Sequence, residues 1–392
     1  MHKRAILSRV GSSTRLVLAI SATLVGCGLT PESSVPTPEL PVGSVLANVN
    51  QDWWQSFSDP ALTRLVEQAL AYNADLLVAL ARVEEARAAL GIAGAEQLPQ
   101  LGLQAAGART RNSPQSGLVV GPNSSFQLAG IASWELDLWG RVRNQAQAAR
   151  YLVAGSEAAR DAVRLQVAAD TAQAYFNLRA LDGQLVVAQE TLKSRNAAYD
   201  IQSKRFKGGL ISELDVRQAE ADLTSAQAAV PTYQQGVAQA EAVLAVLTGL
   251  SPKAWLGAGL ERGKRIGEFE APPPAIAAMP SDVLLRRPDI AQAENALRSA
   301  HAQVASARAA WFPRISLSSL AGVASGDLSK LFSNAGLWNF AGNMTMPLFN
   351  NGLTAAQVDQ ARARDQVAAA QYQKAVQAAF ADTYVSLALN QT

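Results

Sequence analysis

The stretch that decides the fold is Ser124-Ser-Phe-Gln-Leu-Ala-Gly-Ile-Ala-Ser-Trp-Glu-Leu-Asp-Leu138, in which side chains of two kinds alternate. From residue 126 on, the even-numbered side chains are apolar and the odd-numbered ones mostly polar. Alternation over this length predicts a β-strand with one apolar and one mostly polar face. Residues 337–349 alternate in the same way. The large side chains on the two apolar faces include Phe126, Leu128, Trp134, Trp338, Phe340 and Met344.

A weaker candidate strand precedes each of these two, at residues 101–111 and 314–324, with a loop rich in Gly, Pro and Ser between the partners. Strands of ten or more residues with one apolar face are typical of transmembrane β-barrels, so we predict that the apolar face contacts lipid. A soluble sandwich with one solvated face is the alternative. Four strands cannot close a barrel singly, and closure removes exposed edges, so we expect the strands to be shared among copies of the chain.

Long helices follow the strands. No proline interrupts residues 141–207, which would extend about 100 Å as a helix. Apolar and small residues then recur at alternating spacings of three and four from Val216 to Leu247, which indicates a coiled-coil seam. Pro231 lies beside this seam, and we expect it to kink the helix or to break its hydrogen-bond ladder. We predict an antiparallel hairpin over residues 141–248. Its tip, either a simple turn or a partner-binding site, comprises Gly208, Gly209, Leu210, Ile211 and Ser212.

The chain also repeats itself. Asp75 and Pro99 in one segment answer to Asp289 and Pro313 in another, at a common offset of 214 residues. Each unit reads as helix, strand, loop, strand and helix, so the sequence predicts a fold of two structural repeats. Nothing in the second repeat answers to residues 184–249 of the first, so we expect the second repeat to be incomplete and the chain to be truncated at its C-terminus.

The N-terminus has the pattern of an export signal: basic residues, a short apolar run, then Leu24-Val-Gly-Cys27. Cys27 is the one cysteine of the chain, and this motif resembles a bacterial lipobox, which implies lipid attachment at Cys27. A plain signal peptide with an incidental cysteine is the alternative. The predicted organisation is a signal peptide at 1–26, a lipidated extended tether at 27–50, a first repeat at 51–279 with the linker 250–279, and a second repeat at 280–392.

Several function classes find no support. The net charge is +2 and no basic run follows the first fifteen residues, so nothing indicates nucleic acid. No metal-ligand spacing, phosphate loop or nucleophile motif is present, so we expect no catalytic residue, no metal and no cofactor. His301 stands alone on an alanine-rich helix and reads as an ordinary helix residue. Arg109 and Arg111, near a strand end, could line a pore or simply be solvated.

Four segments resemble the outer-membrane factors of tripartite efflux systems: Trp53–Pro60, Trp134–Arg143, Pro280–Ile290 and Phe312–Leu317. The lipobox is similar to that of the NodT-type lipoprotein branch of these TolC-like channels. The resemblance covers Cys27 to Thr392. It implies a mixed α and transmembrane β fold, in which long helical hairpins form a periplasmic tunnel. It also implies a homotrimer, each subunit giving four strands to one twelve-stranded barrel.

The resemblance further implies that the hairpin tip meets a periplasmic adaptor protein and that an inner-membrane pump drives export. A second tip and a gate would lie beyond Thr392, so we expect this chain alone not to be a competent channel. The expected function is a passive duct for small molecules in the outer membrane, anchored by lipid and extending into the periplasm, and not an enzyme. The alternative is a periplasmic coiled-coil scaffold or adaptor lipoprotein that forms no pore.

Overall fold

The computed structural model describes residues 52–113, 115, 121–251, 253–255, 259–269 and 287–389. The predicted signal peptide, Cys27, the tether and residues 280–286 of the segment Pro280–Ile290 lie outside these residues. The described residues divide into two units, each of which takes segments from both predicted repeats. The strand unit comprises Glu84–Gly155 and Ala291–Val376, and the hairpin unit comprises the described parts of Leu40–Val83, Ser156–Ile290 and Gln377–Thr392.

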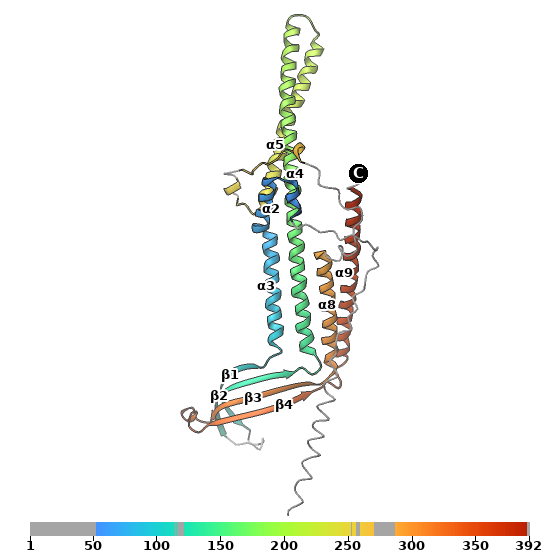
Figure 1. The fold of residues 1–392 in the computed structure, drawn as a ribbon. Helices are drawn as coiled ribbons and strands as arrows, with labels where there is room; N and C mark the ends of the chain where they lie inside the picture. The colour runs from blue at the N-terminus through green and yellow to red at the C-terminus, as the bar shows by residue number, and fades with distance from the viewer. Residues whose placement is uncertain are drawn as a thin grey trace, which may run out of the picture. The chain divides into compact units, whose positions relative to one another are not determined.

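One antiparallel sheet forms the strand unit's β structure, with the strand order β1-β2-β3-β4 (Figure 1). The four strands that the sequence predicts are all present. The strand order makes β1 and β4 the edges of the sheet. Their bounds are Gln100–Asn112 for β1, Gly121–Leu136 for β2, Arg314–Ser325 for β3 and Gly336–Thr345 for β4.

Two strands end sooner than the alternation suggests. β2 stops at Leu136 because the next residue is used to begin a helix: the Asp137 carboxylate accepts a hydrogen bond of 2.8 Å from the backbone N–H of Arg143. β4 stops at Thr345, two residues before Pro347, whose missing N–H cannot join a strand ladder. The alternating pattern therefore continues past the end of each strand without backbone pairing.

The register collects the apolar sides of all four strands on one face of the sheet. Directly opposed residues share a face in an antiparallel pair. The pairs Ala105↔Leu128, Trp134↔Leu317, Ile315↔Met344 and Ala321↔Trp338 therefore put all of these residues on one side. We call this side the apolar face; it carries the odd-numbered residues of β1 and β3 and the even-numbered residues of β2 and β4.

Four long helices flank the strands in sequence, and two hydrogen bonds near the sheet join the segment after β2 to the segment before β3. Within the strand unit, the Ser306 hydroxyl donates to the carbonyl of Arg141 at 2.9 Å. The Trp139 indole donates to the carbonyl of Pro313 at 2.8 Å and stacks on Phe312. The helices are α3 (Ala74–Ala95), α4 (Arg141–Lys207), α8 (Pro288–Arg308) and α9 (Leu353–Leu389).

His301 is more than a solitary helix residue. Its Nδ1 lies 2.6 Å from Oδ1 of Asp365, which joins α8 to α9 within the strand unit. Both side chains are largely buried. The sequence expectation was incomplete because Asp365 is 64 residues away and no local pattern links the two positions.

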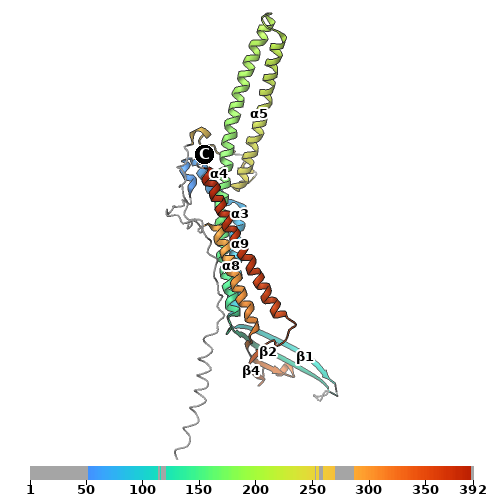
Figure 2. The same ribbon diagram turned by 90° about the vertical axis from the view of Figure 1, so that its right-hand side faces the viewer.

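The hairpin unit is built from the rest of α4 and from α5 (Glu213–Leu247), which run antiparallel (Figures 1 and 2). All ten seam positions from Val216 to Leu247 are buried or half-buried. α5 is not interrupted at Pro231, whose side chain is exposed. A proline removes one helical hydrogen bond, so packing along the seam is what holds this helix together at that point.

The core of the hairpin unit lies where two short elements, η2 (Trp53–Phe57) and α2 (Pro60–Tyr72), pack against α4 and α5. α2 and α3 are separated at Asn73, because the Asn73 side chain caps α3 by accepting from the N–H of Asp75 at 2.9 Å. Over the described residues, no helix combines the length and apolar character needed to cross a membrane. The buried core residues include Trp54, Leu62, Leu65, Val66, Tyr175, Leu178 and Leu244.

Candidate functional site

The apolar face of the sheet leaves large side chains uncovered. On the edge strands, Trp338 is 81%, Met344 70% and Leu101 83% exposed. Phe126 and Leu128, on the inner strand β2, are half-buried by their neighbours. Monomeric soluble proteins rarely expose a continuous apolar patch of this kind. The face therefore fits contact with lipid.

The remaining predicted lipid-facing residues, Trp134 and Phe340, lie on the same face. The indole N–H of Trp134 donates to the carbonyl of Gln97 at 3.0 Å, so its polar atom is satisfied at the helix end of the sheet. An indole with a bonded N–H and an exposed ring suits the boundary between water and lipid. The register thus brings all six predicted residues onto one surface.

The opposite face of the sheet carries Gln104, Gln127, Ser133 and Glu135. Glu135 accepts two hydrogen bonds, of 2.9 and 2.8 Å, from the guanidinium of Arg141 at the start of α4. This bidentate pair fixes the helix start against the polar face. We call this side the polar face; its side chains can contact water and dissolved solutes.

The hairpin tip is a turn whose geometry requires glycine. Gly209 has φ +73°, in the left-handed region that favours glycine. The N–H of Gly208 donates to the carbonyl of Lys204, and the N–H of Leu210 donates to that of Arg205, which satisfies the last carbonyls of α4. Ser212 then caps α5 through reciprocal hydrogen bonds with Asp215. Turn formation alone therefore accounts for Gly209 and Ser212.

Turn formation does not account for the apolar residues of the tip. Leu210 is 76% exposed, and Leu214 in the first turn of α5 is 74% exposed, while Ile211 is half-buried. Sequence reasoning missed Leu214. The available signal was that it precedes the seam, which begins at Val216, and so has no place in the hairpin interface. Leu210 and Leu214 are the residues at the tip that a partner can cover.

A buried polar network fixes the base of the hairpin. Asp59 is 1% exposed and caps α2 by accepting from the N–H of Ala61 at 2.8 Å. The same carboxylate accepts from the Tyr175 hydroxyl at 2.6 Å and from the N–H of Lys264 at 3.0 Å. Tyr175 in turn accepts from the N–H of Gly263 at 3.1 Å. A side chain at Gly263 would collide with Asp59. The network therefore fastens the segment 259–265 to α2 and α4.

The electrostatics of the network follow from these bonds. Burial raises the pKa of Asp59, but the hydrogen bonds that its carboxylate accepts outweigh burial, so its pKa lies below the ordinary value. Burial, together with the bond to Asp59, raises the pKa of Tyr175 above its ordinary value. Nearby, Arg262 bridges Asp182 on α4 and Glu241 on α5. An aspartate directly before a proline, as at Asp59-Pro60, indicates a helix cap in the sequence. No local pattern indicates the other partners of Asp59, because they lie far along the chain.

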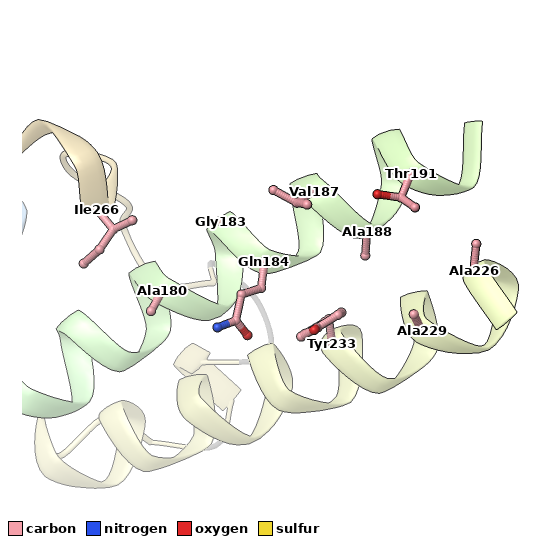
Figure 3. Close-up of a pocket in the computed structure, with 10 residues that line it drawn as sticks. All are labelled: Ala180, Gly183, Gln184, Val187, Ala188, Thr191, Ala226, Ala229, Tyr233 and Ile266. Carbon is pink, nitrogen blue, oxygen red and sulfur yellow. The ribbon is translucent and has the colours of Figure 1, made fainter. Parts of the chain in front are cut away.

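An open groove of about 620 Å³ lies between α4 and α5, with Ile266 at one end (Figure 3). Its walls are mainly apolar residues, most of them small, and the polar side-chain atoms come from three residues, Gln184, Thr191 and Tyr233. The described residues contain no group of three or more His, Cys, Asp or Glu side chains that could hold a metal ion. The groove lining is Ala180, Gly183, Gln184, Val187, Ala188, Thr191, Ala226, Ala229, Tyr233 and Ile266.

Comparison with known proteins agrees with this architecture. The family model "Outer membrane efflux protein" matches residues 65–250 and 279–392. The chain is 34% identical over 398 residues to the probable efflux pump outer membrane protein TtgC of Pseudomonas putida, covering 96% of this chain and 80% of the relative. It is 32% identical over 388 residues to the cation efflux system protein CusC of Escherichia coli K12, covering 96% and 83%.

A solved structure shares the fold. The Campylobacter jejuni CmeC outer membrane channel aligns with a TM-score of 0.86 and 28% identity, over 92% of this chain and 79% of that one. The resemblance inferred from four short segments is thereby confirmed, and the pore-free scaffold is set aside. The chain belongs to the outer membrane efflux protein family, and it is a channel subunit of a tripartite efflux system rather than an enzyme.

Proposed function

We propose that this chain works as a homotrimer that forms a duct for small molecules across the outer membrane. The observation that carries the proposal is the apolar face, because exposed large side chains of β1, β2 and β4 and half-buried apolar side chains of β3 lie together on one side of the sheet. In a barrel this side faces lipid and the polar face lines the lumen. The edge strands β1 and β4 supply the backbone groups through which neighbouring copies pair, giving a barrel of twelve strands.

Pairing between β1 of one copy and β4 of the next can be tested by cross-linking. Gln104 in β1 and Asn339 in β4 both lie on the polar face. We expect the double variant Gln104→Cys/Asn339→Cys, treated with a short bis-maleimide, to give a covalent trimer on denaturing gels. The matched control is Gln127→Cys/Asn339→Cys, because Gln127 lies on the inner strand β2.

The unmodified chain controls for reaction through Cys27. A covalent trimer from the β1–β4 pair alone supports barrel closure. Equal cross-linking of the β1–β4 and β2–β4 pairs, or none of either in folded protein, would contradict pairing through the sheet edges.

The hairpin tip is the second part of the proposal. Leu210 and Leu214 dock a periplasmic adaptor protein, through which an inner-membrane pump delivers its cargo. Exposed leucines at the end of a coiled coil are unfavourable in water unless a partner covers them. They lie among charges of both signs: Lys204, Arg205 and Lys207 end α4, and Glu213 and Asp215 begin α5.

Anchoring and cargo complete the proposal. Cys27 carries a lipid that holds the mature N-terminus in the outer membrane, as its position after Leu24-Val25-Gly26 supports. The cargo class is broad. Relatives of similar identity are named for efflux of toluene, antibiotics and cations, which favours a lumen that selects loosely.

A further inference from the structure

The apolar face carries two charged residues, and both lie at the same end of one strand. Arg109 and Arg111 have odd numbers in β1, so the register puts them on the side of Leu101, Phe126 and Trp338. Every other described strand residue on this face is uncharged. The sheet's other charged residues, Glu135 and Arg314, lie on the polar face. Arg109 and Arg111 therefore cannot line a lumen formed by the polar face.

Their position along the strand corresponds to the edge of a membrane. Arg109 is eight residues beyond Leu101, which is about 27 Å along a strand or about 20 Å along the membrane normal at the usual tilt of ~40°. The apolar band of outer-membrane barrels is ~25 Å tall. On the apolar face, the last apolar pair of β1 and β2 in this direction is Gly107↔Phe126, and the next pair on that face is Arg109↔Ser124. The arginines thus begin where the apolar band ends.

Energetics agree with this placement. An arginine on the lipid face costs ~2–4 kcal/mol at the membrane midplane but only ~0–1 kcal/mol near the interface. The arginine end of β1 is also the end away from α3, which precedes β1 in the chain. Since the helices extend into the periplasm in the proposed function, this end of the sheet lies at the outer surface.

Both guanidinium groups are available to a ligand. Arg109 and Arg111 are exposed, and neither forms a hydrogen bond or an ion pair with a described residue. A guanidinium presents five donors in a planar fork that matches the oxygens of a phosphate. On the same face, Phe126 lies opposite Gly107, directly below Arg109, and Leu103 lies farther along β1; both offer apolar contact to an acyl chain. The surface therefore combines two cationic groups that can bind phosphate with apolar side chains that can contact an acyl chain.

We propose that Arg109 and Arg111 bind the phosphate groups of a phosphorylated glycolipid in the outer leaflet of the outer membrane. The inference rests on the proposed function, since it requires the apolar face to contact lipid. The arginines then act as a clamp that sets the height of the sheet in the membrane. Charge complementarity and the adjoining apolar surface favour a lipid headgroup over a free anion.

The test uses the full chain purified in detergent and bisphosphorylated lipid A as the probe, with binding measured by native mass spectrometry. We expect Arg109→Gln/Arg111→Gln to lower the affinity about thirtyfold, at ~1 kcal/mol for each arginine near a charged surface. Arg314→Gln is the matched control, because it removes an exposed arginine from the other face and end of the same sheet. It should leave the affinity unchanged. Dephosphorylated lipid A should bind the unaltered chain as weakly as lipid A binds the double variant.

Equal affinity of the double variant and the unaltered chain for lipid A would overturn the inference. So would equal binding of phosphorylated and dephosphorylated lipid, or displacement of lipid A by inorganic phosphate, which would indicate a free-anion site. Conductance in planar bilayers separates this result from failure of the proposed function. If the chain conducts and the lipid result is negative, only the arginine clamp fails; if the chain neither inserts nor conducts, the proposed function and the clamp fail together.

Discussion

Replacing Asp59 by asparagine should loosen the base of the hairpin unit. The asparagine carbonyl can still cap α2 by accepting from the N–H of Ala61, since Asn and Asp are similar as caps. Its amide nitrogen, however, then points at the N–H of Lys264 and at the Tyr175 hydroxyl, both of which donate to Asp59 in the structure. The bond to Lys264 is lost, and the bond to Tyr175 survives only if the hydroxyl turns to accept from the amide.

The expected loss of stability in Asp59→Asn follows from the number and kind of hydrogen bonds that are lost. A hydrogen bond to a charged group contributes ~1.5–3 kcal/mol, and leaving a buried donor unpaired costs ~1–3 kcal/mol. Asp59 is 1% exposed, so water cannot replace the lost partner. Loss of one such bond and weakening of another should cost about 2–4 kcal/mol in the local stability of α2.

Hydrogen exchange measured by mass spectrometry on peptides from η2 and α2 reports this local stability. We expect exchange in α2 to quicken about thirty- to several-hundredfold in Asp59→Asn, the factor that ~2–4 kcal/mol represents. Glu67→Gln is the matched control, because Glu67 is an exposed carboxylate on the same helix. Unchanged exchange in Asp59→Asn, or an equal change in Glu67→Gln, would refute the role assigned to the buried network.

The stabilisation that Asp59 contributes also depends on pH. Because the pKa of Asp59 is lower in the folded chain than in the unfolded chain, its stabilising effect is complete above the unfolded value of ~3.9. The effect is lost as the pH falls through the folded pKa. The difference between the unaltered chain and Asp59→Asn should therefore be constant from about pH 7 to pH 5 and shrink below about pH 4.

Three further changes test other parts of the account. Leu128→Arg should cost ~2–4 kcal/mol and block assembly in the outer membrane, whereas Gln127→Arg on the polar face should not; equal tolerance in a heat-modifiability assay would contradict the assignment of faces. Leu210→Asp should abolish efflux in a complementation assay while leaving membrane insertion intact, and surviving efflux would make the tip purely structural. Mass spectrometry should find a diacylglyceryl group on Cys27, and an unmodified mature terminus would exclude the lipid anchor.

Local periodicity was sufficient to predict much of the fold. The alternation at 124–138 gave the strand and its apolar side, because a strand's period of two is visible in any one segment. The bounds of α4, residues 141–207, were predicted to the residue, since it lacks proline and ends at a glycine pair. The seam from Val216 to Leu247 likewise depends only on local spacing, and it remained helical through Pro231 because packing outweighs one lost hydrogen bond.

Features that depend on distant residues could not be predicted. Asp59 reads as an ordinary helix cap, but its buried partners include Lys264, 205 residues away. The same is true of the contact between His301 and Asp365. Arg109 was ambiguous because the face that a residue occupies in a sheet depends on strand register, which the weak pattern of 101–111 did not fix. Pairing with the strongly patterned β2 resolves it.

In the proposed function, the four-stranded sheet of this chain forms a conducting path across a membrane. Single-channel recording of the purified chain in planar lipid bilayers measures that conduction. The sequence alone led us to expect that this chain is not a competent channel, but all four strands of the predicted barrel are present in one sheet, so we now predict discrete conductance steps. Leu128→Arg should abolish these steps, and Gln127→Arg should retain them with an altered amplitude, since residue 127 lies on the polar face. Folded, trimeric protein that is incorporated in lipid but carries no current at any applied potential would contradict the account.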